Sequence, residues 1–173
     1  GEEGDFYYII KQGTAKVTRA ASSGSDLILA TLGPGDAFGE EALLAETQRN
    51  ATVVMEIDGA LMRLSKEDFD LLLREPVINW LPAEDLRSRI ESGAKIIDVR
   101  HEKEFLNDGV KGCENIPLYM LRLKMTNLDR DVSYITYCDS GRRSSAAAFL
   151  LSEKGFDCSV LEGGLKGAEN LWR

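Results

Sequence analysis

Residues 134–151 read YITYCDSGRRSSAAAFLL. The first four residues are β-prone and the residues from Ser144 onward are apolar, which predicts a strand, a tight loop and a helix. The loop begins with Cys138. Backbone amides at the N-terminus of a helix are unpaired and carry the positive end of the helix dipole. We therefore expect this cysteine to lose its proton more easily than a free thiol, whose pKa is about 8.5, and to act as a nucleophile.

Three further residues of the loop favour a negative charge on the sulfur. Gly141 lets the loop curl so that successive amides converge on one point. Arg142 and Arg143 add positive charge next to it. A free cysteine can also be a small core residue, but that role would not explain the glycine, the arginines and the start of a helix. The pattern therefore predicts a site for an anion or a thiolate.

The pattern Cys-x-x-Gly-x-Arg-Ser after a strand resembles the active-site loop of the rhodanese family of sulfurtransferases. The resemblance covers residues 81–173, and further motifs follow in the family's order. They are Asp98-Val99-Arg100, Glu104-Phe105, Gly112-Cys113-Glu114-Asn115-Ile116-Pro117-Leu118, and Leu161-Glu162-Gly163-Gly164-Leu165 with Trp172. The loop from Cys138 to Arg143 is as short as in sulfurtransferases and one residue shorter than in related phosphatases. Sulfur chemistry is therefore favoured over phosphoester or oxyanion chemistry.

The resemblance implies a role for each residue of the loop. Cys138 would attack the sulfane sulfur of a small-molecule or protein donor, hold it as a persulfide and pass it to an acceptor thiol or to cyanide. Asp98 and Arg100 would orient the loop through ion pairs. The residues that would surround the persulfide are Asp139, Ser140, Gly141, Arg142, Arg143 and Ser144. This chemistry requires no cofactor and no metal ion.

Asp139 departs from the family pattern, because the residue after the cysteine is often basic in members that use thiosulfate. A carboxylate at this place opposes both thiolate formation and the entry of a doubly negative donor. We therefore expect thiosulfate to be a poor substrate. A protein persulfide or a small thiol persulfide is the more natural sulfur source.

Strand-like and helix-like segments alternate from Leu81 onward, which predicts βαβ units and a parallel sheet. Ligand sites in such sheets lie beyond the carboxyl ends of the strands, where Cys138 falls. The predicted strands are 95–99, 115–118, 133–137 and 158–161, and the predicted helices are 82–92, 102–106, 119–128 and 144–154.

The first part of the chain reads differently, as short strands separated by Gly-, Ser- and Asp-containing turns. Regular turns between short strands predict an antiparallel barrel or jelly roll. The expected strands are 7–10, 14–19, 27–32, 52–57 and 61–64. We accordingly divide the chain into a β domain at 1–76, from which N-terminal strands are missing, a linker at 77–80 and an α/β domain at 81–173.

Residues 38–53 read FGEEALLAETQRNATV, where a glycine, a short helix and an arginine suit a phosphate. This run resembles the phosphate-binding cassette of cyclic nucleotide-binding domains, and residues 4–13 resemble the hairpin before it. The resemblance implies cAMP or cGMP as ligand, with Glu40 accepting from the ribose 2′-hydroxyl and Arg49 pairing with the cyclic phosphate. Gly39, Glu41, Ala42 and Asn50 would supply further contacts. The alternative is a β domain that keeps this signature and binds no nucleotide.

Composition limits the remaining classes of function. A net charge of −8 argues against binding to nucleic acid or to an anionic membrane surface. No apolar stretch has membrane-spanning length and the start does not resemble a signal peptide, so the cytoplasm is the expected compartment. Three cysteines without a Cys-x-x-Cys pair and a single histidine argue against a disulfide scaffold and a zinc site.

Two functions of different classes fit these observations. The first is a sulfurtransferase that works through a Cys138 persulfide and is regulated by a cyclic nucleotide. The second is a non-enzymatic cyclic-nucleotide sensor in which the rhodanese-like half is a scaffold for partner docking. The open edge of an incomplete β domain can also pair with another chain, which makes a homodimer an expected assembly.

Overall fold

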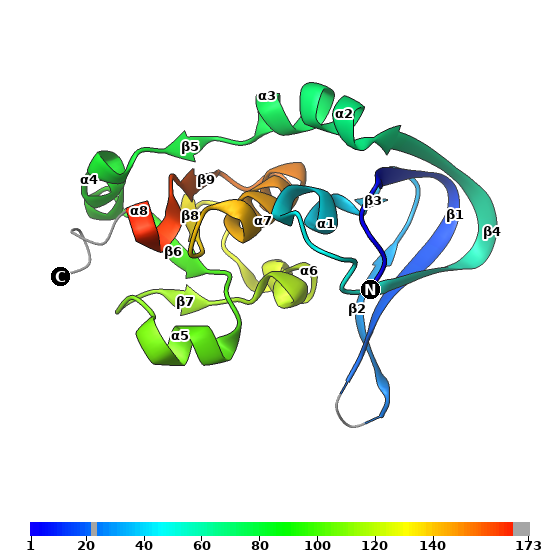
Figure 1. The fold of residues 1–173 in the computed structure, drawn as a ribbon, viewed down its shortest axis with the longest axis horizontal. Coiled ribbons are helices and arrows are strands. Elements are labelled where there is room, and N and C mark those ends of the chain that lie inside the picture. The colour runs from blue at the N-terminus through cyan, green and yellow to red at the C-terminus, as the bar shows by residue number, and fades with distance from the viewer. Residues whose placement is uncertain (22–23, 168–173) are drawn as a thin grey trace. The chain divides into compact units, whose positions relative to one another are not determined.

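The computed structural model describes residues 1–21 and 24–167. The chain divides into two compact units, Gly1–Glu75 and Pro76–Arg173, which we describe separately. Figure 1 shows an antiparallel β unit in the N-terminal half and an α/β unit in the C-terminal half. Trp172, which belongs to a sequence motif, lies outside the described residues. Within the described ranges, no helix combines the length and the apolar character needed to cross a membrane.

The first unit is built around β1 (Phe6–Ala20). This strand pairs in antiparallel fashion with β2 (Asp26–Leu32), β3 (Ala37–Phe38) and β4 (Thr52–Ser65), which confirms the antiparallel architecture predicted for this half. The helical elements are α1 (Glu40–Ala45), α2 (Lys66–Phe69), the π-helical η1 (Asp70–Arg74) and α3 (Glu75–Val77), which runs across the division between the units.

Two strands of this unit are longer than predicted, because four expected strands merge pairwise into β1 and β4. The register of the β1–β4 pair shifts between Ile10 and Ala15, and Gly13 has a φ of +89°. Long antiparallel strands accommodate extra residues as β-bulges, which bend the pair without ending it. Gly13 and the facing Asp58-Gly59 therefore form a bulge where the sequence predicted turns.

The core of the first unit lies between β1 and the short helices. Tyr7 and Phe69 are buried, and their ring centroids lie 4.8 Å apart. Ile10, Leu43 and Leu44 are also almost completely buried. This apolar packing fixes α1 against β1, and α1 carries three of the six candidate nucleotide-binding residues.

The second unit contains a five-stranded parallel sheet with the strand order β5-β9-β8-β6-β7. The alternating segments predicted a parallel sheet, but β5 was not among the predicted strands. Its strands are β5 (Trp80–Leu81), β6 (Lys95–Asp98), β7 (Glu114–Asn115), β8 (Tyr134–Tyr137) and β9 (Cys158–Leu161). Its helices are η2 (Ala83–Asp85), α4 (Leu86–Glu91), α5 (Glu102–Asp108), η3 (Leu118–Met120), α6 (Leu121–Lys124), η4 (Met125–Asn127), α7 (Arg142–Glu153) and α8 (Gly164–Gly167).

Two predicted elements of this unit differ in detail. β7 ends at Asn115, two residues before Pro117, which has no backbone N–H with which to continue the ladder. The segment predicted as one helix at 119–128 consists of η3, α6 and η4. Leu121 and Met125 are both buried and four residues apart, so these pieces still present one apolar face to the core.

The central strand β8 positions the cysteine loop. All four residues of β8 are buried, and Cys138 is the next residue at the carboxyl end of the strand. α7 follows after three more residues and buries an apolar run from Ala146 to Leu151. Two buried elements therefore hold the loop at both ends, which leaves it little freedom to move.

Candidate functional site

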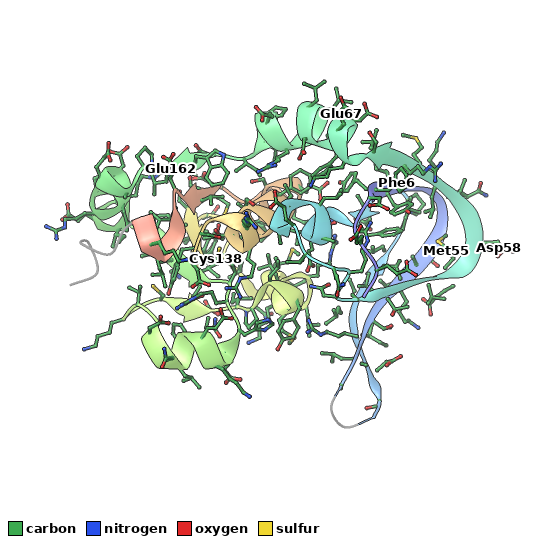
Figure 2. The ribbon with its side chains drawn as sticks, in the orientation of Figure 1. Phe6, Met55, Asp58, Glu67, Cys138 and Glu162 are labelled. Atoms are coloured by element: carbon green, nitrogen blue, oxygen red, sulfur yellow. The ribbon has the colours of Figure 1, made fainter. Side chains whose placement is uncertain are left out.

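The sulfur of Cys138 lies inside the loop that joins β8 to α7 (Figure 2). The backbone N–H of Gly141 donates to Sγ at 3.2 Å, and the hydroxyl of Ser144 lies 3.5 Å from Sγ. Hydrogen bonds donated to a sulfur stabilise a negative charge on it. Cys138 is only 1% exposed, so a reactant must present its sulfur at the end of a narrow approach.

Gly141 has the backbone conformation that this loop requires. It caps the N-terminus of α7 with a φ of +95°, which is a left-handed conformation that residues with a Cβ rarely adopt. A Cβ added here would lie 3.4 Å from the ring of Trp80, the first residue of β5. Trp80 stood in the linker predicted at 77–80, and in the structure it pairs with Val160 of β9. An aromatic ring thus lies directly against the residue that donates to the nucleophilic sulfur.

The other side of the loop rests on the Gly163-Gly164 pair at the start of α8. The N–H of Leu165 donates to the carbonyl oxygen of Cys138 at 2.8 Å. A Cβ at Gly164 would lie 2.2 Å from that oxygen, and Gly164 has a φ of +58°. Gly164 is therefore required for two reasons: the carbonyl oxygen of Cys138 leaves no room for a Cβ, and the backbone has a left-handed conformation.

Arg100 is the buried centre of an ion-pair network beneath the loop. Its side chain is 2% exposed and donates to Asp98 through Nε and one terminal nitrogen. Its other terminal nitrogen donates to Asp108 at 2.8 Å and to Asp139 at 3.2 Å. Burial alone would lower the pKa of Arg100, but the hydrogen bonds to Asp98 and Asp108 outweigh it and raise that pKa. The network ties the end of β6 to the residue after the cysteine.

Arg143 makes a second network at the start of α7. Its two terminal nitrogens donate to the two carboxylate oxygens of Glu104, each at 2.8 Å. One of them also donates to Asp139 at 2.8 Å. The hydrogen bond to Glu104 is the main reason that the pKa of Arg143 is raised. Arg142 and Ser140, the other polar members of the loop, are exposed.

Glu104 is a site residue whose role the sequence did not reveal. The Glu104-Phe105 pair was visible as a motif, but nothing in it indicated a partner 39 residues away in the chain. The hydrogen bond from Arg143 lowers the pKa of the Glu104 carboxyl from 4.5 to about 2. Glu104 also accepts from the backbone N–H of His101 at 2.9 Å, which closes a capping box at the start of α5.

The lowered pKa of Glu104 predicts how the loop responds to acid. A carboxyl whose pKa is depressed by folding stabilises the folded state above the unfolded pKa, and this contribution is lost as the pH falls. We expect Glu104→Gln to reduce the free energy of unfolding at pH 6 by less than about 1 kcal/mol, since both partners are partly exposed. The difference should vanish as the pH falls from 4.5 toward 2. Urea titrations across this range would measure it, and a difference independent of pH would contradict the assignment.

The other two cysteines are not comparable nucleophiles. Burial raises the pKa of the Cys113 thiol to about 11 and that of the Cys158 thiol to about 12. All three cysteines are free thiols. Cys113 and Cys158 therefore stay protonated near neutral pH.

The first unit brings together the six residues of the candidate nucleotide site. Arg49 donates to the carbonyl oxygens of Gly39 and Phe6, both at 2.7 Å. Asn50 donates to the carboxylate of Glu41 at 2.8 Å. Glu40 and Ala42 are buried in α1 beside these contacts. The Phe6 carbonyl is a member of this cluster that the sequence did not indicate, because a backbone oxygen leaves no sequence signal.

Comparison with known families agrees with both halves of the structure. The rhodanese-like domain family matches residues 82–170, and the cyclic nucleotide-binding domain family matches residues 1–75. The chain therefore belongs to the rhodanese-like family and carries a cyclic nucleotide-binding domain in front of it. Both resemblances stated from the sequence motifs are confirmed.

Similar individual proteins are found for each half. A cAMP-dependent protein kinase regulatory subunit of Yarrowia lipolytica is 41% identical over 85 residues, which cover 49% of this chain and 22% of the relative. A tRNA sulfurtransferase of Shewanella woodyi is 42% identical over 72 residues, which cover 39% of this chain and 15% of the relative. The chain thus spans less than a quarter of each of these two relatives.

Among solved structures, a rhodanese-related protein from Thermoplasma volcanium superposes with a TM-score of 0.51 and 32% sequence identity. The superposition covers 54% of this chain and 92% of that protein. The superposition therefore includes nearly the whole of that protein and about half of this chain. It supports the rhodanese-like fold of the C-terminal half.

Proposed function

We propose that the C-terminal unit transfers sulfane sulfur through a persulfide on Cys138. The observation that carries the proposal is the position of Sγ, which accepts from the Gly141 amide at the N-terminus of α7. In the first step, the Cys138 thiolate attacks the terminal sulfur of a donor R–S–SH. A new S–S bond forms at Cys138, the donor S–S bond breaks, and the thiolate R–S⁻ leaves. No outside oxidant or reductant is needed.

The second step regenerates the enzyme. An acceptor thiolate attacks the outer sulfur of the Cys138 persulfide, takes that sulfur and releases the Cys138 thiolate; with cyanide the product is thiocyanate. The Gly141 amide and the Ser144 hydroxyl are positioned to stabilise charge at the inner sulfur as it leaves. Donor and acceptor are small molecules or proteins, and the cytoplasm, where free thiols persist, is the proposed compartment.

Intact-mass spectrometry tests this function directly. The purified chain is incubated with thiosulfate and, separately, with glutathione persulfide, and the sulfur adduct is mapped by peptide analysis. We expect a gain of one sulfur atom on Cys138 from the persulfide and a smaller yield from thiosulfate, because an acidic residue, Asp139, directly follows Cys138 in the chain. A chain with a free Cys138 thiol that gains no sulfur from either donor would overturn the proposal.

We also propose that the N-terminal unit binds a cyclic nucleotide and that this ligand regulates sulfur transfer. The supporting observation is that the Arg49 guanidinium is held within the cluster formed by Gly39 and α1. Glu40 would accept from the ribose 2′-hydroxyl, and Arg49 would exchange a backbone carbonyl for the phosphate. An effector changes activity only if it binds two states with different affinity, so the rate of sulfur uptake must differ with and without nucleotide.

Replacement of Arg49 tests the nucleotide site. Hydrogen bonds to charged groups contribute about 1.5–3 kcal/mol each, so Arg49→Leu should weaken binding of cAMP or cGMP by about tenfold to hundredfold. Isothermal titration calorimetry measures this change. Arg74→Leu is the matched control, because this replacement makes the same change in charge. Arg74 pairs with Asp70 on the helical segment after the sheet. Equal affinity of the two variants would exclude Arg49 as the phosphate ligand.

The sensor without catalysis is the alternative function. The presence of a cyclic nucleotide-binding domain favours it, because such a domain can act by changing partner binding alone. In that case nucleotide binding would persist while no sulfur reached Cys138. The mass measurement and the calorimetric measurement together distinguish the two functions.

A further inference from the structure

Carboxylates outnumber guanidinium groups in the described residues that form ion pairs around the cysteine loop. The two guanidinium groups belong to Arg100 and Arg143. The four carboxylates that pair with them are those of Asp98, Asp108, Asp139 and Glu104. Arg143 is the second residue of α7, directly after the exposed Arg142, and it is a candidate partner of an anionic donor. The pairing of Arg143 therefore bears on which donors the site accepts.

Glu104 occupies the part of Arg143 that recognises anions. A guanidinium binds a planar or tetrahedral anion through two parallel N–H donors. Both terminal nitrogens of Arg143 already donate to Glu104 at 2.8 Å, and one of them is shared with Asp139. An incoming anion would have to displace Glu104 before it could bind both terminal nitrogens of Arg143 in this bidentate geometry.

The orientation of Glu104 is fixed independently of Arg143. Its carboxylate accepts from the N–H of His101 and so caps α5, which places it at the start of a helix. Rigid support of this kind keeps a charged group at one place when a ligand approaches. Glu104 is therefore a fixed negative charge next to the loop.

We propose that Glu104 is a positioning residue that sets donor specificity by engaging both terminal nitrogens of Arg143. This inference rests on the proposed sulfur transfer. Thiosulfate is a dianion and releases sulfite, which is itself an anion, so it needs the guanidinium that Glu104 occupies. A persulfide donor carries at most one charge at its reacting sulfurs, so it does not. The site thus selects persulfides of small thiols or proteins over inorganic sulfur dianions.

A charge-neutral replacement at this position tests the proposal. Glutamine keeps the oxygen that caps α5 and removes only the charge. We expect Glu104→Gln to raise the ratio of kcat/KM for thiosulfate to that for glutathione persulfide by about tenfold, through a lower KM for thiosulfate. The thiosulfate KM of the variant should also depend more steeply on salt. In the variant the Arg143 guanidinium attracts the dianion, and salt screens this attraction.

Glu102→Gln is the matched control. Glu102 is an exposed residue of the same helix, and its replacement makes the same change in net charge. We expect its donor ratio to equal that of the wild type. A ratio that stays unchanged in Glu104→Gln while persulfide turnover continues would overturn the specificity role and leave sulfur transfer standing. A wild type that accepts sulfur from neither donor would instead overturn the proposed function itself.

Discussion

A Cys138→Ser variant is expected to take up no sulfur from thiosulfate or from glutathione persulfide, with a loss of transfer of more than about a thousandfold. A serine hydroxyl stays protonated where a thiolate forms, and it cannot form the S–S bond that carries the transferred atom. The other cysteines do not substitute for it, because burial raises the pKa of Cys113 to about 11 and that of Cys158 to about 12. Intact mass after incubation, with peptide mapping, measures the loss.

Cys113→Ser is the control for this variant, since Cys113 is a partly buried free thiol that is not a residue of the loop. It should gain sulfur as the wild type does. Sulfur found on Cys138→Ser at the level of the wild type would show that another thiol is the carrier. If calorimetry shows that Cys138→Ser retains nucleotide binding, the loss of transfer is a chemical effect and not a failure to fold.

Arg100→Leu is expected to have the largest effect on stability. The variant leaves Asp98 buried without its guanidinium partner, and removal of one member of a buried pair costs about 3–5 kcal/mol. Domains are stable by only about 5–15 kcal/mol, so the second unit should lose a large share of its stability. Both tryptophans, Trp80 and Trp172, belong to the second unit. Tryptophan fluorescence during urea unfolding therefore reports on this unit alone.

The double variant Asp98→Asn with Arg100→Leu separates lost packing from uncompensated charge. Neutral asparagine removes the charge that arginine balanced, so the double variant should be more stable than Arg100→Leu. Equal stability of the single and double variants would mean that the arginine acts through packing alone. In that case the ion pair between Asp98 and Arg100 would not contribute to the stability of the second unit.

The features that were predicted correctly from the sequence are those that depend on residues close together in the chain. The β-prone run before Cys138, the glycine at the helix start and the alternation of strands and helices are all local, and they led to the parallel sheet and the loop at the end of β8. The long strands β1 and β4 were not predicted, because a glycine signals a turn and a bulge alike until the partner strand is known. The pairing of Glu104 with Arg143 could not be predicted either, because it joins residues far apart in the chain.

The strand β5 has a practical consequence for dissecting this protein. The match to the rhodanese-like family begins at residue 82, after both residues of β5. A fragment cut at that boundary would lose the strand that pairs with β9 and the indole that lies against Gly141. A fragment that begins at Pro76 keeps both. Activity compared between the two fragments would therefore differ for a reason unrelated to the nucleotide, because Trp80 and the rest of β5 belong to the second unit itself.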